Sequence, residues 1–174
     1  MDKRKEANIR VKTNITEALF ALMHEKSFSD ITVTELIRKA GVARASYYRN
    51  YDSMEDVLIT LVEYVLNSFR NEAEYDLTDY FSYQNVLRSF QYFKMYGTYV
   101  LDMYQSGFGS QLLEGLNQFH EDIAGTMSVN SIDKYKLYIY MGALFNTALV
   151  WLKGGTRESV EDITAVFCRV IGIT

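Results

Sequence analysis

Apolar residues recur at helical spacing along almost the whole chain, and the breaks between the periodic segments are short. In the first segment Ile15, Leu19 and Leu22 share one face, as the three- and four-residue repeat of an α-helix requires. Proline is absent, which suits helices joined by short connections. The pattern predicts an all-α fold with helices over about residues 5–24, 32–40, 43–50, 53–69, 82–96, 98–105, 108–124, 131–152 and 158–171.

The stretch from Phe28 to Leu58 is the most informative part of the chain. Thr32 and Glu35 form the T-x-x-E pattern of a capping box at the start of a helix. Gly41 follows that helix, at a position where a helix C-terminus needs a positive φ, and a second helix can begin by Ala43. Two helices joined by so short a glycine-containing turn form a helix-turn-helix unit, whose second helix enters the DNA major groove. The segment therefore predicts DNA binding.

Charge is divided unevenly along the 174 residues, whose net charge is −4. Residues 1–50 hold ten Lys/Arg and six Asp/Glu, a net charge of +4, whereas residues 51–174 hold eight and sixteen, a net charge of −8. A basic head on an acidic body is expected when only the head meets phosphates, although chance clustering in a solvated terminus gives the same pattern. Acidic and polar residues from Asn71 to Asp79 predict the junction between head and body.

Three observations favour a protein of the cytoplasm. The single cysteine, Cys168, cannot form an internal disulfide, and no charged-then-apolar signal segment opens the chain. The longest apolar run, Ile139–Trp151, is about 13 residues long and is interrupted by Asn146, which is too short for a membrane span of about 20 residues.

Three groups of residues carry a family resemblance: Thr32–Leu36, Ala40–Val42 and Ser46–Tyr51. With them, about 50 N-terminal residues resemble the TetR/AcrR family of one-component transcriptional regulators. The resemblance implies a three-helix DNA-binding head, a fourth helix that links it to the body, and a ligand cavity in a dimerising body. We therefore expect a helix-turn-helix DNA-binding domain over residues 1–52 and a helical effector-binding and dimerisation domain over residues 53–174.

Four positions depart from the family pattern. Ala43 stands where a serine commonly caps the recognition helix, and a lost cap costs about 1 kcal/mol. Ala45 replaces a frequent glycine, although its methyl could meet a thymine methyl. Asn50 replaces a common histidine but keeps a donor for a phosphate, and Met54 replaces a lysine that is expected to contact one. These changes bear on the operator sequence and on affinity.

The predicted DNA-contacting residues lie on the two helices of the helix-turn-helix. Arg44 is a candidate for reading guanine, and a phosphate contact or a solvated side chain is its alternative. Tyr48 is expected on the DNA face rather than in the core, whereas Tyr47 and Tyr51 are expected to be core aromatics. Thr32 is either a cap or both a cap and a phosphate ligand. The full predicted set is Thr32, Thr34, Arg44, Ala45, Ser46, Tyr48, Arg49 and Asn50.

The body is rich in aromatic residues, which suit either an effector cavity with apolar walls or an ordinary core. Its last two helices, about residues 131–171, carry broad apolar faces that predict a homodimer interface, with an intramolecular core as the alternative. No charged residue stands out as an effector partner. The predicted pocket residues are Tyr64, Phe90, Phe93, Tyr96, Tyr99, Met103, Phe119, Tyr140 and Phe145.

An enzyme is not expected. His24 and His120 have no metal-ligand companions at useful spacing, and Cys168 sits in an apolar helix. We predict no metal and no cofactor. The leading hypothesis is a homodimeric repressor that leaves a near-palindromic operator when a small apolar or aromatic effector binds. The alternative is a regulator or adaptor whose body binds a partner protein.

Overall fold

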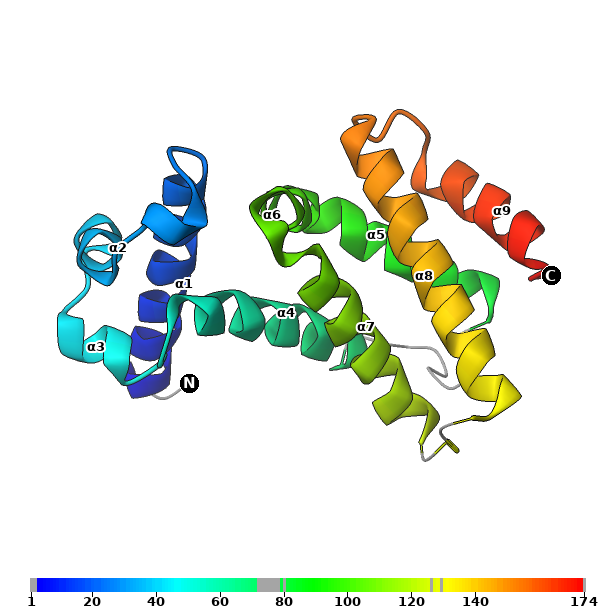
Figure 1. The fold of residues 1–174 in the computed structure, drawn as a ribbon, viewed down its shortest axis with the longest axis horizontal. Helices are drawn as coiled ribbons and strands as arrows, with labels where there is room; N and C mark the ends of the chain where they lie inside the picture. The colour runs from blue at the N-terminus through cyan, green and yellow to red at the C-terminus, as the bar shows by residue number, and fades with distance from the viewer. Residues whose placement is uncertain (1–2, 72–78, 80, 126, 129, 174) are drawn as a thin grey trace. The chain divides into compact units, whose positions relative to one another are not determined.

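The computed structural model describes the chain except residues 1–2, 72–78, 80, 126, 129 and 174. Every regular element in the described part is helical, so the all-α prediction is confirmed (Figure 1). Most of the predicted junction from Asn71 to Asp79 lies outside the described residues. The elements are α1 (Lys3–Met23), η1 (Phe28–Asp30), α2 (Val33–Ala40), α3 (Arg44–Tyr48), α4 (Met54–Asn71), α5 (Tyr83–Met95), α6 (Gly97–Met103), η2 (Tyr104–Phe108), α7 (Gly109–Ala124), α8 (Ile132–Lys153) and α9 (Val160–Ile171).

Contacts divide the chain into two compact units, Met1–Tyr64 and Val65–Thr174. The division falls within α4, whose first residues pack in one unit and whose last residues pack in the other. The functional boundary expected after residue 52 stays a prediction. No described helix has the length and apolar character that a bilayer-spanning segment needs.

The first unit is a small bundle in which α1 packs against α2 and α3 (Figure 1). The side-chain amide of Asn14 on α1 donates to the carbonyl oxygen of Ala40 at 3.4 Å, which ties α1 to the end of α2. Tyr47 and Tyr51 are buried, as the sequence predicts. The core of this unit consists of side chains at most 4% exposed: Ile15, Leu19, Phe20, Ile31, Leu36, Tyr47, Tyr51, Val57 and Leu58.

The second unit is held together by ring contacts among α5, α8 and α9. Phe90 on α5 meets Trp151 on α8 and Phe167 on α9, each at a centroid distance of 5.8 Å. Tyr140 on α8 also meets Phe167 at 5.8 Å. Because aromatic side chains bury large areas, these edge-to-face contacts fix how the helices of the bundle pack.

Helix ends in the second unit follow their local signals. Ser82, Ser131 and Ser159 cap α5, α8 and α9 through their side chains. The predicted helices therefore begin one residue before α5 and α8, and two residues before α9. Gly155 adopts a positive φ of 82° after α8, which confirms the predicted stop. Gly107, with φ 92°, breaks the helical path inside the π-helical segment η2, an element that the sequence pattern did not predict.

Candidate nucleic-acid interface

The N-terminus of α2 is fixed by a complete capping box, as predicted. The backbone amide of Glu35 donates to Thr32 Oγ1 at 3.2 Å, and the amide of Thr32 donates to Glu35 Oε2 at 3.1 Å. The hydroxyl of Thr32 also donates to Glu35 Oε2 at 3.0 Å. Lys26 donates to the same carboxylate at 2.7 Å, and this ammonium, together with the capping bonds, lowers the pKa of Glu35 from 4.5 to about 2. The carboxylate is therefore charged at neutral pH, and it orders the first turn of α2.

The turn between the two helices depends on Gly41. Its φ of 64° and ψ of 33° lie in the left-handed region that favours glycine. The amide of Gly41 donates to the carbonyl of Arg38 at 3.3 Å, and the amide of Val42 donates to that of Ile37 at 3.1 Å. These bonds close the end of α2 as in a Schellman motif, and α3 starts three residues later.

The recognition helix α3 is shorter than predicted: it spans Arg44–Tyr48, and Arg49 and Asn50 follow its end. The amides of Asn50 and Tyr51 both donate to the carbonyl of Tyr47, at 2.9 and 3.0 Å, in a turn that closes the helix. The Asn50 side chain donates to the carbonyl of Ser46 at 2.8 Å. Ala43 provides no side-chain cap at the other end, as its methyl group implies.

Tyr47 anchors α3 to the core. Its side chain is fully buried, and its ring lies 5.1 Å edge-on from that of Tyr48 and 5.8 Å from that of Tyr51. Burial raises the pKa of Tyr47 to about 12, so the phenol stays neutral. A short helix without an N-cap is marginal alone, and the buried ring compensates by tying it to the core of the first unit.

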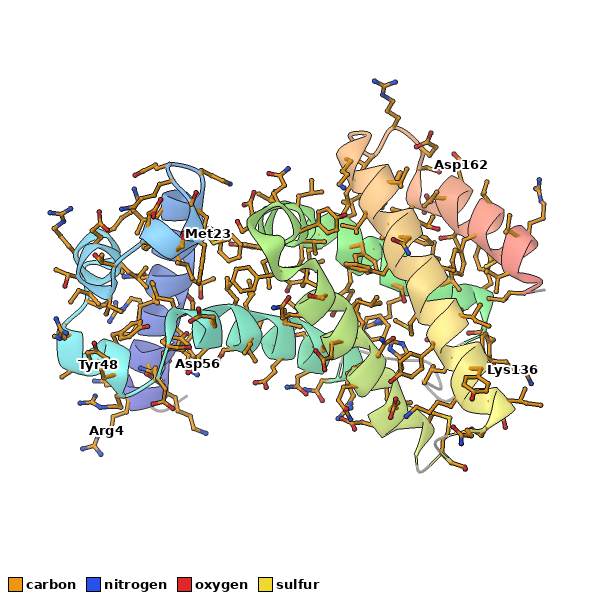
Figure 2. All side chains as sticks on the ribbon, in the orientation of Figure 1. Arg4, Met23, Tyr48, Asp56, Lys136 and Asp162 are labelled. Atoms are coloured by element: carbon orange, nitrogen blue, oxygen red, sulfur yellow. The ribbon has the colours of Figure 1, made fainter. Side chains whose placement is uncertain are left out.

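The outward side of α3 carries an arginine and a tyrosine in contact. Arg44 Nη2 donates to the hydroxyl of Tyr48 at 3.2 Å, and the guanidinium carbon lies 5.3 Å from the centroid of the tyrosine ring. Tyr48 is 48% exposed, and Figure 2 shows it on α3. Of the predicted DNA-contacting residues, Thr32, Thr34, Arg44, Ala45, Tyr48 and Arg49 are exposed, whereas Ser46 and Asn50 are half-buried.

The start of α4 contains a second capping arrangement. Ser53 is the residue whose side chain caps, since it accepts from the amide of Asp56 at 3.1 Å. In return, Asp56 accepts from the amides of Asp52 and Ser53 at 2.9 and 3.0 Å. The S-x-x-D spacing carries this signal in the sequence.

A cleft of about 320 Å³ lies beside the end of α3, and its charge limits where a polyanion can approach. Three carboxylates, of Asp52, Asp56 and Glu63, line it together with the single arginine Arg49. Their repulsion disfavours phosphate inside the cleft, so the cationic outer surface of α3 is the better phosphate-facing side. The cleft residues are Tyr48, Arg49, Asn50, Tyr51, Asp52, Asp56, Ile59, Thr60 and Glu63.

Residues 15–61 match the sequence family described as bacterial regulatory proteins, tetR family. That segment contains the end of α1, the capping box of α2, the Gly41 turn, α3 and the start of α4. The N-terminal part of the chain therefore matches the TetR family. The helices that the resemblance implied as a DNA-binding head are the ones that this match covers, which supports a TetR-type DNA-binding transcriptional regulator.

Solved structures of transcriptional regulators share the fold over nearly the whole chain. A TetR transcriptional regulator from Streptococcus agalactiae 2603V has a TM-score of 0.65 at 19% identity, covering 97% of this chain and 97% of its own. The dihydroxyacetone kinase operon activator DhaS has a TM-score of 0.61 at 15% identity, covering 92% of this chain and 93% of its own. A TetR regulator from Rhodococcus sp. RHA1 has a TM-score of 0.54 at 19% identity, covering 97% and 98%. At these identities, the likeness establishes the fold.

The residues predicted to line an effector pocket in this TetR-type body occupy different environments. Phe93 and Phe145 are brought together, with ring centroids 6.5 Å apart. Tyr64 is 63% exposed and belongs to the first compact unit. Tyr96 and Tyr99 are half-buried. The remaining members, Phe90, Phe93, Met103, Phe119, Tyr140 and Phe145, are buried. The pocket as a whole stays a prediction.

Two arginines outside the predicted sets lie over aromatic rings of the body. The guanidinium of Arg70 is 4.9 Å from the centroid of the Phe119 ring. That of Arg88 is 5.4 Å from Phe69 and 5.6 Å from Tyr92. Arg88 and Tyr92 are four residues apart on α5, whereas the contacts of Arg70 with Phe119 and of Arg88 with Phe69 arise from the packing of α4, α5 and α7.

Proposed function

We propose that the protein is a homodimeric TetR-type repressor that binds a near-palindromic operator in the cytoplasm. The observation that carries this proposal is α3, whose outer surface presents Arg44 and Tyr48 while Tyr47 holds the helix in the core. An arginine near the start of a recognition helix has the geometry to donate to guanine O6 and N7. Ala45, exposed beside it, offers a methyl for apolar contact with thymine.

The phosphate contacts that fix the register are assigned to the neighbours of this pair. Arg49 is exposed and cationic, and Thr34 exposes its hydroxyl on the first turn of α2. Ser46 and Asn50 contribute at the half-buried edge of the helix. The hydroxyl proton of Thr32 is directed to Glu35, so Thr32 acts chiefly by ordering the end of α2. Such contacts position the protein without reading sequence.

The exposed faces of α8 and α9 support a homodimer. Part of the broad apolar face of α8, including Leu137, Tyr140 and Leu144, is buried in the chain's own core, which is the alternative that the sequence left open for this face. A different stripe of α8 is exposed, and Ile139 within it is 68% exposed. Exposed large apolar side chains on the two helices are Ile132, Tyr135, Tyr138, Ile139 and Val150 of α8 and Val166 and Val170 of α9.

These side chains recur mostly every three or four residues, so each helix presents one apolar stripe to solvent. A two-fold pairing of the stripes buries them and forms a four-helix interface. A dimer with its recognition helices about 34–36 Å apart would place one in each of two successive major grooves.

The regulatory part of the proposal rests on the aromatic body. A small apolar or aromatic effector that binds one spacing of the heads better than another would shift the population toward that spacing. Release from the operator then follows from the difference in affinity between the two states. One fold neighbour is an operon activator, so the repressor assignment is tested separately, by transcription from a promoter that carries the operator.

The test of DNA binding uses the full chain and duplexes enriched from a random library. Arg49→Ala is expected to weaken binding to all duplexes and to reduce the slope of log K against log salt by about 0.9 for each lost phosphate contact. Lys136→Ala is the matched control, because it removes an exposed cation of the body, whose ammonium pairs with Asp133 at 3.3 Å. Enrichment of no sequence by the wild type, or equal salt slopes for both variants, would contradict the proposed function.

A further inference from the structure

The structure connects the buried core of the head with its exposed arginine through one intermediate ring. Tyr47, fully buried, packs edge-on against Tyr48 at 5.1 Å. Tyr48 in turn contacts Arg44 twice, through its hydroxyl at 3.2 Å and through its ring at 5.3 Å. A solvent-exposed arginine samples many rotamers, and both contacts restrict them before any DNA is bound.

The chemistry of the hydroxyl allows a second role at the same time. A phenol has one proton to donate and two lone pairs to accept with. Because Arg44 is the donor in this pair, the Tyr48 hydroxyl acts as acceptor and keeps its own proton available for a phosphate oxygen. The guanidinium uses one of its five N–H groups on Tyr48, which leaves its other donors available for a forked contact.

We infer that Tyr48 is a positioning residue that holds Arg44 ready to read one guanine in each half-site. This inference rests on the proposed function and assigns a role beyond the phosphate contact predicted for Tyr48. Arg44 and Tyr48 are four residues apart, about one helical turn, so α3 alone can bring their side chains into contact. Preorganisation makes guanine recognition at one position depend on a hydroxyl that never touches the base.

The experiment measures base discrimination with full-length protein. Duplexes enriched by the wild type from a random library are altered one base pair at a time, and each guanine is also replaced by 7-deazaguanine, which lacks the N7 acceptor. Arg44→Ala is expected to lower discrimination at a single guanine of each half-site by about tenfold. Tyr48→Phe, which keeps the ring and removes only the hydroxyl, is expected to lower discrimination at that same guanine by about fivefold.

Two further variants test whether Tyr48 acts by positioning Arg44 or by stabilising the head as a whole. In the Arg44→Ala background, Tyr48→Phe is expected to cause no further loss at that guanine, because the two residues act as one unit. Arg44→Lys keeps the charge and leaves the packing of Tyr48 untouched, so it should lose guanine discrimination while keeping the salt slope. Thermal unfolding by circular dichroism checks that each variant is folded.

Equal weakening of all duplexes by Tyr48→Phe, with guanine preference kept, would overturn the inference and leave Tyr48 as a phosphate contact only. Retention of guanine preference by Arg44→Ala would overturn it as well. A wild type that enriches no sequence would overturn the proposed function together with this inference. A wild type that enriches one sequence, with Tyr48→Phe unchanged at every base, would overturn this inference alone.

Discussion

Lys26 and Glu35 form an ion pair of 2.7 Å that ties the loop after α1 to the first turn of α2. The same carboxylate closes the capping box with Thr32, so one side chain orders both the entry to α2 and its path from α1. The two helices of the DNA-binding motif are thus held from the α2 side by charge and from the α3 side by the buried Tyr47.

Because of this ion pair, we predict that the free energy of unfolding decreases at acid pH. The pKa of Glu35 is lowered from 4.5 to about 2, chiefly by Lys26, so its contribution is fully present above about pH 5. The contribution is expected to be lost as the pH falls toward 2, because over this range the unfolded state binds the proton more readily than the folded state. The measurement is the melting temperature of wild type and Glu35→Gln between pH 6 and 2.

The difference between these two proteins should shrink as the pH falls, and a constant difference would contradict the assignment. Lys26→Met supplies a second check. Removing the ammonium raises the pKa of Glu35 in the folded state, so the pH-dependent loss of stability should be smaller than in the wild type and should be complete at a higher pH.

Gly41 is expected to tolerate asparagine better than alanine. At φ 64° an alanine methyl is strained, so Gly41→Ala should lower the free energy of unfolding by about 1 kcal/mol. A methyl group on Gly41 would meet no atom of the described residues within 4 Å, so the effect is one of backbone conformation rather than crowding. Gly41→Asn should cost less, because asparagine enters the left-handed region more readily. Equal urea midpoints for the two variants would refute this explanation.

The exposed stripe on α8 and α9 predicts the outcome of placing charge there. Ile139→Glu and Val166→Glu should convert the proposed dimer to a monomer, because each would bury a carboxylate in the proposed apolar interface. Light scattering coupled to size exclusion measures the mass. Ile59→Glu is the matched control, since Ile59 is a comparably exposed isoleucine on the head. A monomeric wild type, or dissociation by the control alone, would contradict the interface.

We expect the stability of the body to require a residue without a side chain at Gly109. Its backbone is helical, with φ −62°, but a methyl group there would lie 2.8 Å from the Tyr104 ring. The ammonium of Lys153 lies 3.9 Å from the centroid of the same ring, which restricts how the ring can move away. Gly109→Ala should therefore destabilise the body by about 1 kcal/mol, despite the better helix propensity of alanine.

The cause can be isolated by shortening the neighbour. In a Tyr104→Ala background, Gly109→Ala should become neutral or stabilising, since the crowding is removed and the propensity gain remains. An unchanged cost in the double variant, measured by urea unfolding, would place the strain elsewhere.

Local sequence signals were sufficient to predict the helix ends of the DNA-binding head. They were insufficient to predict which side chains are exposed on the body. The capping box at Thr32 and the turn at Gly41 each depend on residues within a few positions of one another, so both can be predicted from the sequence. The contact between Arg44 and Tyr48 was missed, although its four-residue spacing was visible, because spacing alone does not say which neighbour a long side chain will choose.

The sequence left open which apolar residues of α8 lie in the core and which meet solvent, for a physical reason. Apolar side chains nearly surround this helix, with Tyr140 and Leu144 buried while Ile139 and Val150 are exposed. Periodicity cannot separate a core face from an exposed one when both are apolar. Only the packing of α5, α6, α7 and α9 against α8 decides between them.

The anchoring of α3 through Tyr47 has a consequence for how such a regulator acquires new targets. The exposed positions Arg44 and Ala45 contribute little to the core, because the buried ring carries the attachment of the helix. Under the proposed function, substitutions at these two positions change operator preference at small cost to folding, so related sequences remain folded proteins while they change the DNA that they recognise.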